Sequence, residues 1–437
     1  MDKLFKLKEH GTNVRTEILA GLTTFLTMAY ILAVNPGMLS GRFAGAEAIV
    51  RMPWGGIFTA TALSAAIACM VMAFLANLPI ALAPGMGLNA FFVYTVVLGM
   101  GYSWELALTA VFLEGILFIV LSVTGVRKAI INAIPANLKK AVAVGIGLFI
   151  ALIGFSNAGI VIQGEGTVIA LGNLGDHQPL LALIGLVIII ILYSLKVPGA
   201  VLIGILATTI ISIPLGVTHI PEGWIPFSMP AAPLFFKFEW HNLLTFKFFT
   251  VFFTFLFVDI FDTVGTLMGI GQQAKLLDKD GNIRNVNKAL LADSIGTVAG
   301  AALGTSTVTS YVESAAGVAA GGKTGLTALS TGILFLLALV LSPLFVLIPG
   351  AATAPALIFV GFLMLKPVKE IDFDDPTEGI PAFMAIVMMP FAYSIAEGIV
   401  YGILTYVVLK AGTGKFKQIP IVTWILFVIF VLRFFLH

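Results

Sequence analysis

The sequence predicts an all-α polytopic membrane protein with about fourteen transmembrane segments. Of its 437 residues, 59% are hydrophobic and only 11% are charged, and the mean hydropathy is +1.06. Soluble domains carry roughly 25% charged residues, so this composition excludes a soluble enzyme. Windows of about 20 mostly apolar residues, the length of a membrane-spanning helix, recur along the whole chain. A single bundle of membrane helices is therefore expected.

Charge and cysteine content narrow the class further. The net charge of +2 leaves no basic excess for a nucleic-acid partner. The single cysteine, Cys69, excludes an internal disulfide, and no Cys/His spacing suggests a metal site. The charged N-terminus, residues 1–16, precedes an apolar segment without a small-residue cleavage site. That segment is expected to be the first membrane helix rather than a removable signal.

The hydropathy pattern places the expected spans in order. They lie near 17–38, 56–78, 85–100, 105–125, 138–156, 179–195, 199–217, 247–271, 288–303, 310–321, 325–342, 350–365, 380–393 and 395–410. A further apolar stretch, 419–436, fits either another span or a helix lying in the membrane interface.

Lys and Arg residues predict the orientation, because cytoplasmic loops collect them. With a cytoplasmic N-terminus, most of the 24 Lys and Arg residues fall inside, and only Arg42, Arg51, Lys237 and Lys247 fall outside. Arg433 lies in the C-terminal stretch. A multi-pass protein of a prokaryotic inner membrane is expected.

Two expected spans, the third and the tenth, look broken. Between spans two and three, Pro79, Pro84, Gly85 and Gly87 interrupt the apolar pattern. The tenth begins with the hydroxyl-rich, β-branched stretch 304–313. Non-helical backbone at membrane depth is tolerated only where it is buried in protein or lines a cavity. Two such breaks in corresponding places therefore predict a binding site near the midplane.

The two halves of the chain resemble each other. Residues 116–122 (ILFIVLS) resemble 333–339 (ILFLLAL), and Ile134-Pro135 recurs as Ile348-Pro349 at nearly the same offset. This spacing predicts a repeat of seven spans. Because seven is odd, the second copy enters the membrane from the opposite side, which gives the inverted repeat of secondary transporters.

Buried carboxylates are the main candidates for a function. Asp259 and Asp262 lie three residues apart in an apolar helix and share one face. Glu313 lies at the break in span ten. An ionised group at the bilayer centre costs about 2.5 to 3.5 kcal/mol, so such residues mark functional sites by default. Glu114 and Glu397 lie on unbroken helices and are expected to be structural.

Several neutral side chains remain open to two interpretations. Asn89, Thr263 and Ser310 either bind a ligand or satisfy backbone groups near the breaks. Asp259 either takes part in the site or bonds a neighbouring helix. Phe91, Phe92 and Phe261 either stack on a flat ligand or pack against lipid and core, as most of the 35 Phe residues must.

Absent motifs exclude other classes of membrane protein. The five histidines lie in loops or at termini, and the chain has no HExxH and no nucleotide-binding GxxxxGK[ST] sequence. A secondary transporter fits best. Its carboxylates would accept hydrogen bonds from a neutral, donor-rich ligand and repel anions. Desolvation would let one carboxylate bind a proton in each cycle, so a proton is the expected coupling ion, without another cofactor or metal. An anion transporter of the same fold and a sensing protein without transport are the alternatives.

Four stretches resemble the AzgA-like branch of the nucleobase:cation symporter-2 family of purine permeases, which take hypoxanthine, guanine or adenine. They are NVRTEILAGLTTFLTMAYIL from Asn13, APGMGLNAFF from Ala83, VDIFDTVGT from Val258 and TVTSYVESAAG from Thr307. The resemblance covers nearly the whole chain. It implies a uracil-permease-like fold with a core domain (1–125 and 247–342) that holds the substrate and a gate domain (126–246 and 343–437).

The resemblance also implies roles for particular residues. Asp262 and Glu313 would bind the nucleobase, with Asn89 and Asp259 also required and Thr263 and Ser310 as further partners. Asp259, Asp262 and Glu313 would serve proton coupling. Import would follow from movement of the core domain against the gate domain, in an elevator-like cycle. A homodimer through the gate domain is a further implication.

Overall fold

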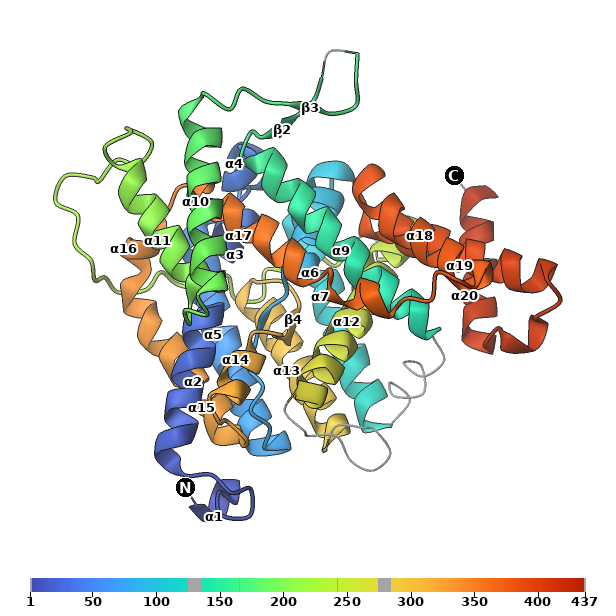
Figure 1. The fold of residues 1–437 in the computed structure, drawn as a ribbon, viewed down its shortest axis with the longest axis horizontal. Coiled ribbons are helices and arrows are strands. Elements are labelled where there is room, and N and C mark those ends of the chain that lie inside the picture. Colours follow the sequence, from blue (N-terminus) through green and yellow to red (C-terminus); the bar gives the residue numbers. More distant parts are fainter. Residues whose placement is uncertain (1, 125–134, 165, 242, 274–283, 436–437) are drawn as a thin grey trace.

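The computed structural model describes residues 2–124, 135–164, 166–241, 243–273 and 284–435. Within these ranges the chain is a bundle of helices with two short pairs of strands (Figure 1). The predicted all-α membrane fold is confirmed. Eight described helices are long and apolar enough to cross a membrane, and four shorter apolar helices accompany them. The number of fourteen spans stays a prediction.

The first part of the chain contains the first broken segment. Its elements are α1 (Asp2–Phe5), α2 (Val14–Met28), α3 (Ile31–Leu39), α4 (Glu47–Val50), α5 (Trp54–Val71), β1 (Leu82–Pro84), α6 (Met86–Ala90) and α7 (Trp104–Val123). A π-helical turn, Met72–Ala76, extends α5, and a second π-helical stretch, Phe91–Gly99, continues α6. The predicted third span is thus a helix that begins only at Met86, after an extended segment.

A second group of elements contains the other broken segment. It comprises α12 (Phe246–Gln273), α13 (Val286–Leu303), β4 (Val308–Ser310), α14 (Ser314–Ala319), α15 (Gly325–Ala338) and α16 (Ser342–Val346). The strand β4 and the two-turn helix α14 replace what the hydropathy pattern placed as a span over 310–321. The prediction that this span is broken is confirmed.

The remaining elements flank these two groups. They are α9 (Ala136–Asn157), β2 (Val161–Ile162), β3 (Ala170–Leu171), α10 (His177–Ser194), α11 (Ala200–Ser212), α17 (Gly350–Leu363), α18 (Pro376–Phe391), α19 (Ile395–Gly412) and α20 (Ile421–Phe435). The stretch 419–436 is therefore helical over Ile421–Phe435, and this helix packs against α19. The two alternatives, a further span and a helix in the membrane interface, both stay predictions.

Two further expected spans differ from the observed helices. The span 17–38 consists of α2 and α3, which meet at Ala29 and Tyr30, where the backbone N–H groups of residues 32 and 33 bond to carbonyls three residues earlier. This tighter turn interrupts the regular α-helical hydrogen bonding. The span 199–217 ends as a helix at Ser212. Pro214 follows, and its ring nitrogen carries no N–H with which to continue the helical hydrogen bonds.

Helix packing divides the bundle into two neighbourhoods. In one, α13 packs against α5 and α7, and α15 packs against α2 and α5. In the other, α9 packs against α17 and α18, α10 packs against α11 and α17, and α18 packs against α19. The strands β1 and β4 lie within the first neighbourhood, and β4 and α14 are near the middle of the bundle in Figure 1.

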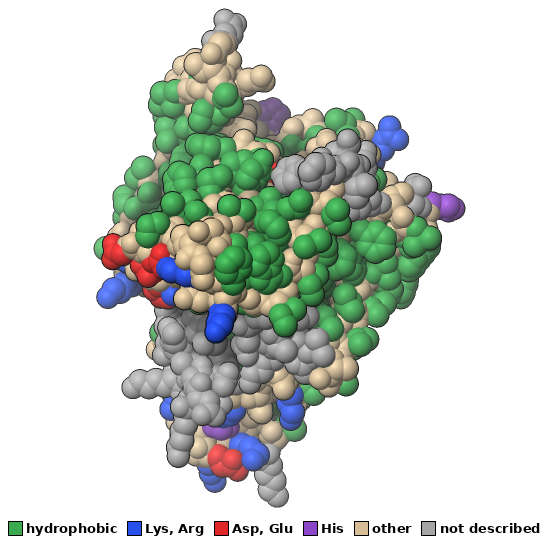
Figure 2. All heavy atoms as spheres, turned by 90° about the vertical axis from the view of Figure 1, so that its right-hand side faces the viewer, with side chains coloured by type: hydrophobic (Ala, Val, Ile, Leu, Met, Phe, Trp, Pro, Cys, Tyr) green, Lys and Arg blue, Asp and Glu red, His purple; other side chains and the backbone are tan. Residues whose placement is uncertain are grey.

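The outer surface is suited to a bilayer. Figure 2 shows apolar side chains over the broad middle of one face, with charged side chains gathered mainly at its left edge and lower end. Large apolar residues are exposed along the outer helices, such as Ile191 on α10, Phe383 on α18 and Val428 on α20. A contiguous apolar surface of this extent is typical of a membrane-embedded protein.

Candidate functional site

The two broken segments pair with each other as antiparallel strands. Leu82 faces Ser310, Ala83 faces Thr309 and Pro84 faces Val308. The pairing extends at both ends, because Gly85 N–H donates to Thr307 O at 2.9 Å and Tyr311 N–H donates to Ala81 O at 3.0 Å. Each segment thereby satisfies backbone groups of the other that no helix satisfies. The pairing joins residues more than 200 positions apart in the chain.

Glu313 lies between β4 and α14, at the start of the short helix. Its side chain is half-buried, and its Oε1 accepts a 2.7 Å hydrogen bond from the Tyr30 hydroxyl. Tyr30 is buried at the junction of α2 and α3. Sequence reasoning missed this residue, because nothing in its local pattern distinguishes it from other aromatic residues in the apolar spans.

Ser310 is the last residue of β4 and faces Leu82 of β1. It is buried, and its hydroxyl has no hydrogen-bond partner among the described residues. A buried hydroxyl without a partner costs free energy, so such groups call for an explanation. A ligand that bonds to the hydroxyl would supply one. Ser310 lies three residues before Glu313 in the chain, and its hydroxyl is available for a hydrogen bond to a ligand.

Asn89 lies in α6 and is fully buried. Its Oδ1 accepts a hydrogen bond from the Ser306 hydroxyl, and its Nδ2 has no partner among the described residues. The two neighbours of Ser306 in the chain make two further long-range hydrogen bonds. Asn35 Nδ2 donates to Thr305 Oγ1 at 2.9 Å, and Thr307 Oγ1 donates to Glu114 Oε2 at 3.1 Å.

Three successive hydroxyl residues, Thr305, Ser306 and Thr307, are thus tied to three different helices, namely α3, α6 and α7. All three residues are fully buried. The lead-in to β4 is fixed by these bonds, and with it the starting point of the segment that carries Ser310 and Glu313.

Asp259 belongs to a separate polar cluster on α12. Thr263 Oγ1 lies 3.1 Å from Asp259 Oδ1 and 3.1 Å from Asp293 Oδ1 of α13, and all three residues are fully buried. One hydroxyl hydrogen serves one carboxylate at a time. Asp293 is a second residue that sequence reasoning missed. The sequence could have indicated it, because Asp293 is a carboxylate within the expected span 288–303.

The helix that carries this cluster is adjacent to the paired strands, since α12 contacts β4, α6 and α14. Asp262 lies in α12 one turn after Asp259, but its side chain is outside the described part of the structure. Phe261 is outside it in the same way. The predicted residues Asn89, Ser310 and Glu313 thus lie on the two paired segments, and Asp259 and Thr263 lie on the neighbouring helix.

A sequence profile of the permease family matches residues 15–401. The chain belongs to this permease family. It is similar to the guanine/hypoxanthine permease PbuG of Bacillus subtilis, with 45% identity over 99% of both chains. It is also similar to the adenine permease AdeQ of Escherichia coli, with 41% identity over 99% of this chain and 96% of that one. The resemblance to the nucleobase:cation symporter-2 family is confirmed, and the protein is a permease rather than an enzyme.

A solved structure shares the permease's fold. The transmembrane domain of the cyanobacterial bicarbonate transporter BicA aligns with a TM-score of 0.66 over 89% of this chain and 97% of that one. Its sequence identity is 16%, so the likeness concerns the fold alone.

An apolar cavity of about 250 Å³ lies elsewhere in the permease, between α12, α19 and α20. Phenylalanine, isoleucine and other apolar side chains line it together with Thr250 and Thr254, and none of the predicted site residues does. The Thr254 hydroxyl donates to Thr250 O within its own helix. The cavity therefore lacks the carboxylates that distinguish the paired strands. Among the described residues, no group of His, Cys, Asp and Glu is arranged to hold a metal ion.

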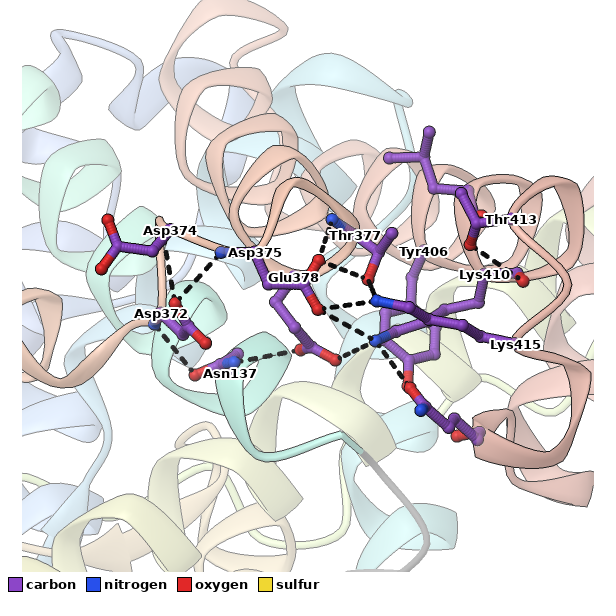
Figure 3. A network of polar contacts seen from close by, with 12 residues as sticks. Asn137, Asp372, Asp374, Asp375, Thr377, Glu378, Tyr406, Lys410, Thr413 and Lys415 are labelled. Atoms are coloured by element: carbon purple, nitrogen blue, oxygen red, sulfur yellow. Dashed lines mark hydrogen bonds and ion pairs between the residues drawn. The ribbon is translucent and has the colours of Figure 1, made fainter.

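A second polar cluster lies at one end of α18 and α19 (Figure 3). Lys410 is buried there, with its Nζ 2.7 Å from Glu378 Oε1 and 3.0 Å from Gln418 Oε1. Glu378 Oε2 in turn accepts from Asn137 Nδ2 of α9 at 3.0 Å. Asp375 caps α18 and pairs with Lys415 at 3.0 Å. This cluster joins α9, α18 and α19 and is separate from the paired strands.

Proposed function

We propose that this permease imports purine nucleobases, namely hypoxanthine, guanine or adenine, by proton symport. The proposal is supported by family membership together with relatives that are named for adenine and for guanine and hypoxanthine and that match over nearly their whole length. The observation that carries it is the antiparallel pairing of β1 and β4, at which a carboxylate, a buried serine hydroxyl and a buried asparagine are found.

The chemistry of these side chains fits a purine. A ring N–H of the base would donate to Glu313, a charge-assisted bond that is stronger than a neutral one. Ser310 Oγ and Asn89 Nδ2 would bond to ring or exocyclic groups, which would supply the partners that they lack among the described residues. Asp262 and Thr263 on α12 would complete the site. Asp259, Asp262 and Glu313 are the candidates for the proton-coupling group.

The transport cycle that we propose moves one part of the bundle against the other. The core domain would comprise residues 1–125 and 247–342, and the gate domain 126–246 and 343–437. The two packing neighbourhoods, α13 with α5 and α7 and α9 with α17 and α18, support this division. We place the permease in the prokaryotic inner membrane with a cytoplasmic N-terminus, in line with its Lys and Arg distribution. A homodimer through the gate domain belongs to the same proposal.

Uptake into proteoliposomes with an inward proton gradient tests the proposal. Radiolabelled hypoxanthine, guanine, adenine and uracil would be compared for wild type, Asp262→Asn and Glu313→Gln, with Glu47→Gln on the exposed helix α4 as the matched control. We expect purine accumulation that a protonophore abolishes and that both site variants lose, while the control keeps it. Absence of purine uptake with flux of sulfate instead would favour the anion alternative, which the carboxylates disfavour.

A further inference from the structure

Tyr30 is buried inside the bundle, yet it is polar at one end. Its side chain is 1% exposed and lies where α2 ends and α3 begins. A buried tyrosine places its ring in apolar surroundings and needs a hydrogen-bond partner for its hydroxyl. Here the hydroxyl donates to Glu313 Oε1 at 2.7 Å, a bond between residues 283 positions apart. A bond between a hydroxyl and a carboxylate at this distance belongs to the strong class.

The backbone around Glu313 packs on the first span. The Thr27 hydroxyl donates to Thr24 O of its own helix at 2.8 Å and lies 3.4 Å from the main-chain oxygen of Glu313. The helix α14 that follows Glu313 packs directly on α2, since a Cβ added to Gly317 would lie 2.0 Å from Thr24 Oγ1 and 2.6 Å from Ala20 O. The contact with α2 therefore fixes the backbone at Glu313, and Tyr30 fixes its carboxylate.

We propose that Tyr30 is the positioning residue of the nucleobase site: it orients the Glu313 carboxylate for the base by holding Oε1. This inference rests on the proposed function and adds a residue to it. A glutamate has three rotatable side-chain bonds, and a bond from a rigid, buried ring removes most of that freedom before the ligand arrives. Preorganisation of this kind raises affinity because the side chain is already ordered before the ligand binds, so less conformational entropy is lost on binding.

The hydroxyl group suits both protonation states of Glu313. It donates to the ionised carboxylate, and because it also carries acceptor lone pairs it can accept from the protonated one. Tyr30 therefore keeps its partner in place whichever state the transport cycle requires. A phenylalanine at this position keeps the ring and loses both abilities.

The test is a double-mutant cycle on ligand affinity in purified full-length permease. Binding of hypoxanthine, guanine and adenine would be titrated for wild type, Tyr30→Phe, Glu313→Ala and the double variant. The matched control is Tyr94→Phe, which removes another buried tyrosine hydroxyl, one that accepts from Asn157 Nδ2 at 2.8 Å. We expect Tyr30→Phe to weaken binding of the transported base about 10- to 100-fold, the range for a bond to a charged group. Tyr94→Phe is expected to change it less than about threefold.

The cycle distinguishes positioning from general stability. If Tyr30 acts through Glu313, Tyr30→Phe has little further effect in the Glu313→Ala background, which has no side-chain acceptor for the Tyr30 hydroxyl. An equal loss in both backgrounds, unchanged binding by Tyr30→Phe, or an equal loss from Tyr94→Phe would overturn the inference. A Tyr30→Phe protein that fails to fold while Tyr94→Phe folds would assign Tyr30 a structural role and overturn it as well. Wild type that binds no purine would refute the proposed function itself, and the inference with it.

Discussion

Thr307 and Glu114 join the second broken segment to a helix of the first half of the chain through a 3.1 Å hydrogen bond from Thr307 Oγ1 to Glu114 Oε2. Both residues are fully buried. Glu114 was expected to be structural because it lies on an unbroken helix. The structure shows which structural role Glu114 has. Its partner Thr307 lies directly before β4, so the hydrogen bond between them helps to set the position of the paired strands.

The first prediction concerns this bond. In Glu114→Ala the Thr307 hydroxyl loses its acceptor inside the bundle, and a buried group left without a partner costs about 1–3 kcal/mol. We expect a lower melting temperature and reduced purine uptake, with Glu114→Gln intermediate because its amide oxygen still accepts. Glu105→Ala, in the first turn of the same helix, is the control. Melting temperature and uptake that match this control in Glu114→Ala would contradict the prediction.

The second prediction separates binding from stability at Ser310. Its hydroxyl has no partner among the described residues, so Ser310→Ala removes no bond that they show and should leave the melting temperature unchanged or slightly higher. If the hydroxyl bonds to the base, the KM for uptake should rise about 2- to 10-fold.

Ser314→Ala is the matched comparison for Ser310→Ala. Ser314 Oγ accepts from Ala81 N–H at 3.0 Å, so its loss should lower the melting temperature. An unchanged KM in Ser310→Ala would remove Ser310 from the site.

Local sequence pattern predicted the breaks but not their pairing. Pro84, Gly85 and the hydroxyl-rich stretch 304–313 indicate non-helical backbone, because Pro lacks an N–H and β-branched residues favour extended conformations. The register that sets Leu82 opposite Ser310 depends on contacts between distant parts of the chain, and no local rule encodes it.

The same limit applies to the site. Asn89 and Glu313 stand out because such polar residues are rare in the apolar segments, whereas Ser310 is one of several hydroxyls and was singled out by the family resemblance. The structure finds all three on the paired strands or directly beside them. Tyr30 does not stand out, because its role depends on a partner 283 positions away. Asp293, like Asp259, is a carboxylate in an apolar helix, and this much is visible in the sequence. That the Thr263 hydroxyl lies within hydrogen-bond distance of both carboxylates is visible only in the structure.

The third prediction concerns the buried ion pair of Lys410 and Glu378 (Figure 3). Removing one partner of a buried pair leaves an uncompensated charge, which typically costs about 3–5 kcal/mol. Lys410→Met should therefore lower the melting temperature markedly. The exposed Lys417→Met, in the loop after α19, is the control and should change it little. Since the cluster lies apart from the paired strands, the KM of the folded fraction should match wild type. An altered KM would show that the cluster influences the site.

The fourth prediction is a pH dependence of stability at Asp375, which lies in the loop before α18. Two contacts hold the pKa of this carboxyl well below its usual range. The hydrogen bond from the backbone N–H of Thr377 has the largest effect, and the bond from the Lys415 ammonium comes next. A lowered pKa in the folded state means that the unfolded state binds more protons in acid. The stabilisation is thus fully present above the unfolded pKa of about 4 and is lost as the pH falls below it.

Melting temperatures of wild type and Asp375→Asn between pH 3 and pH 7 measure this effect. Asn keeps the helix cap but cannot ionise, so wild type should be the more stable protein at pH 7, and the difference should shrink as the pH falls below about 4. Asp374→Asn, at the exposed neighbouring position, should follow wild type throughout. A difference between wild type and Asp375→Asn that stays constant over this range would mean that the charge of Asp375 is not what stabilises the start of α18.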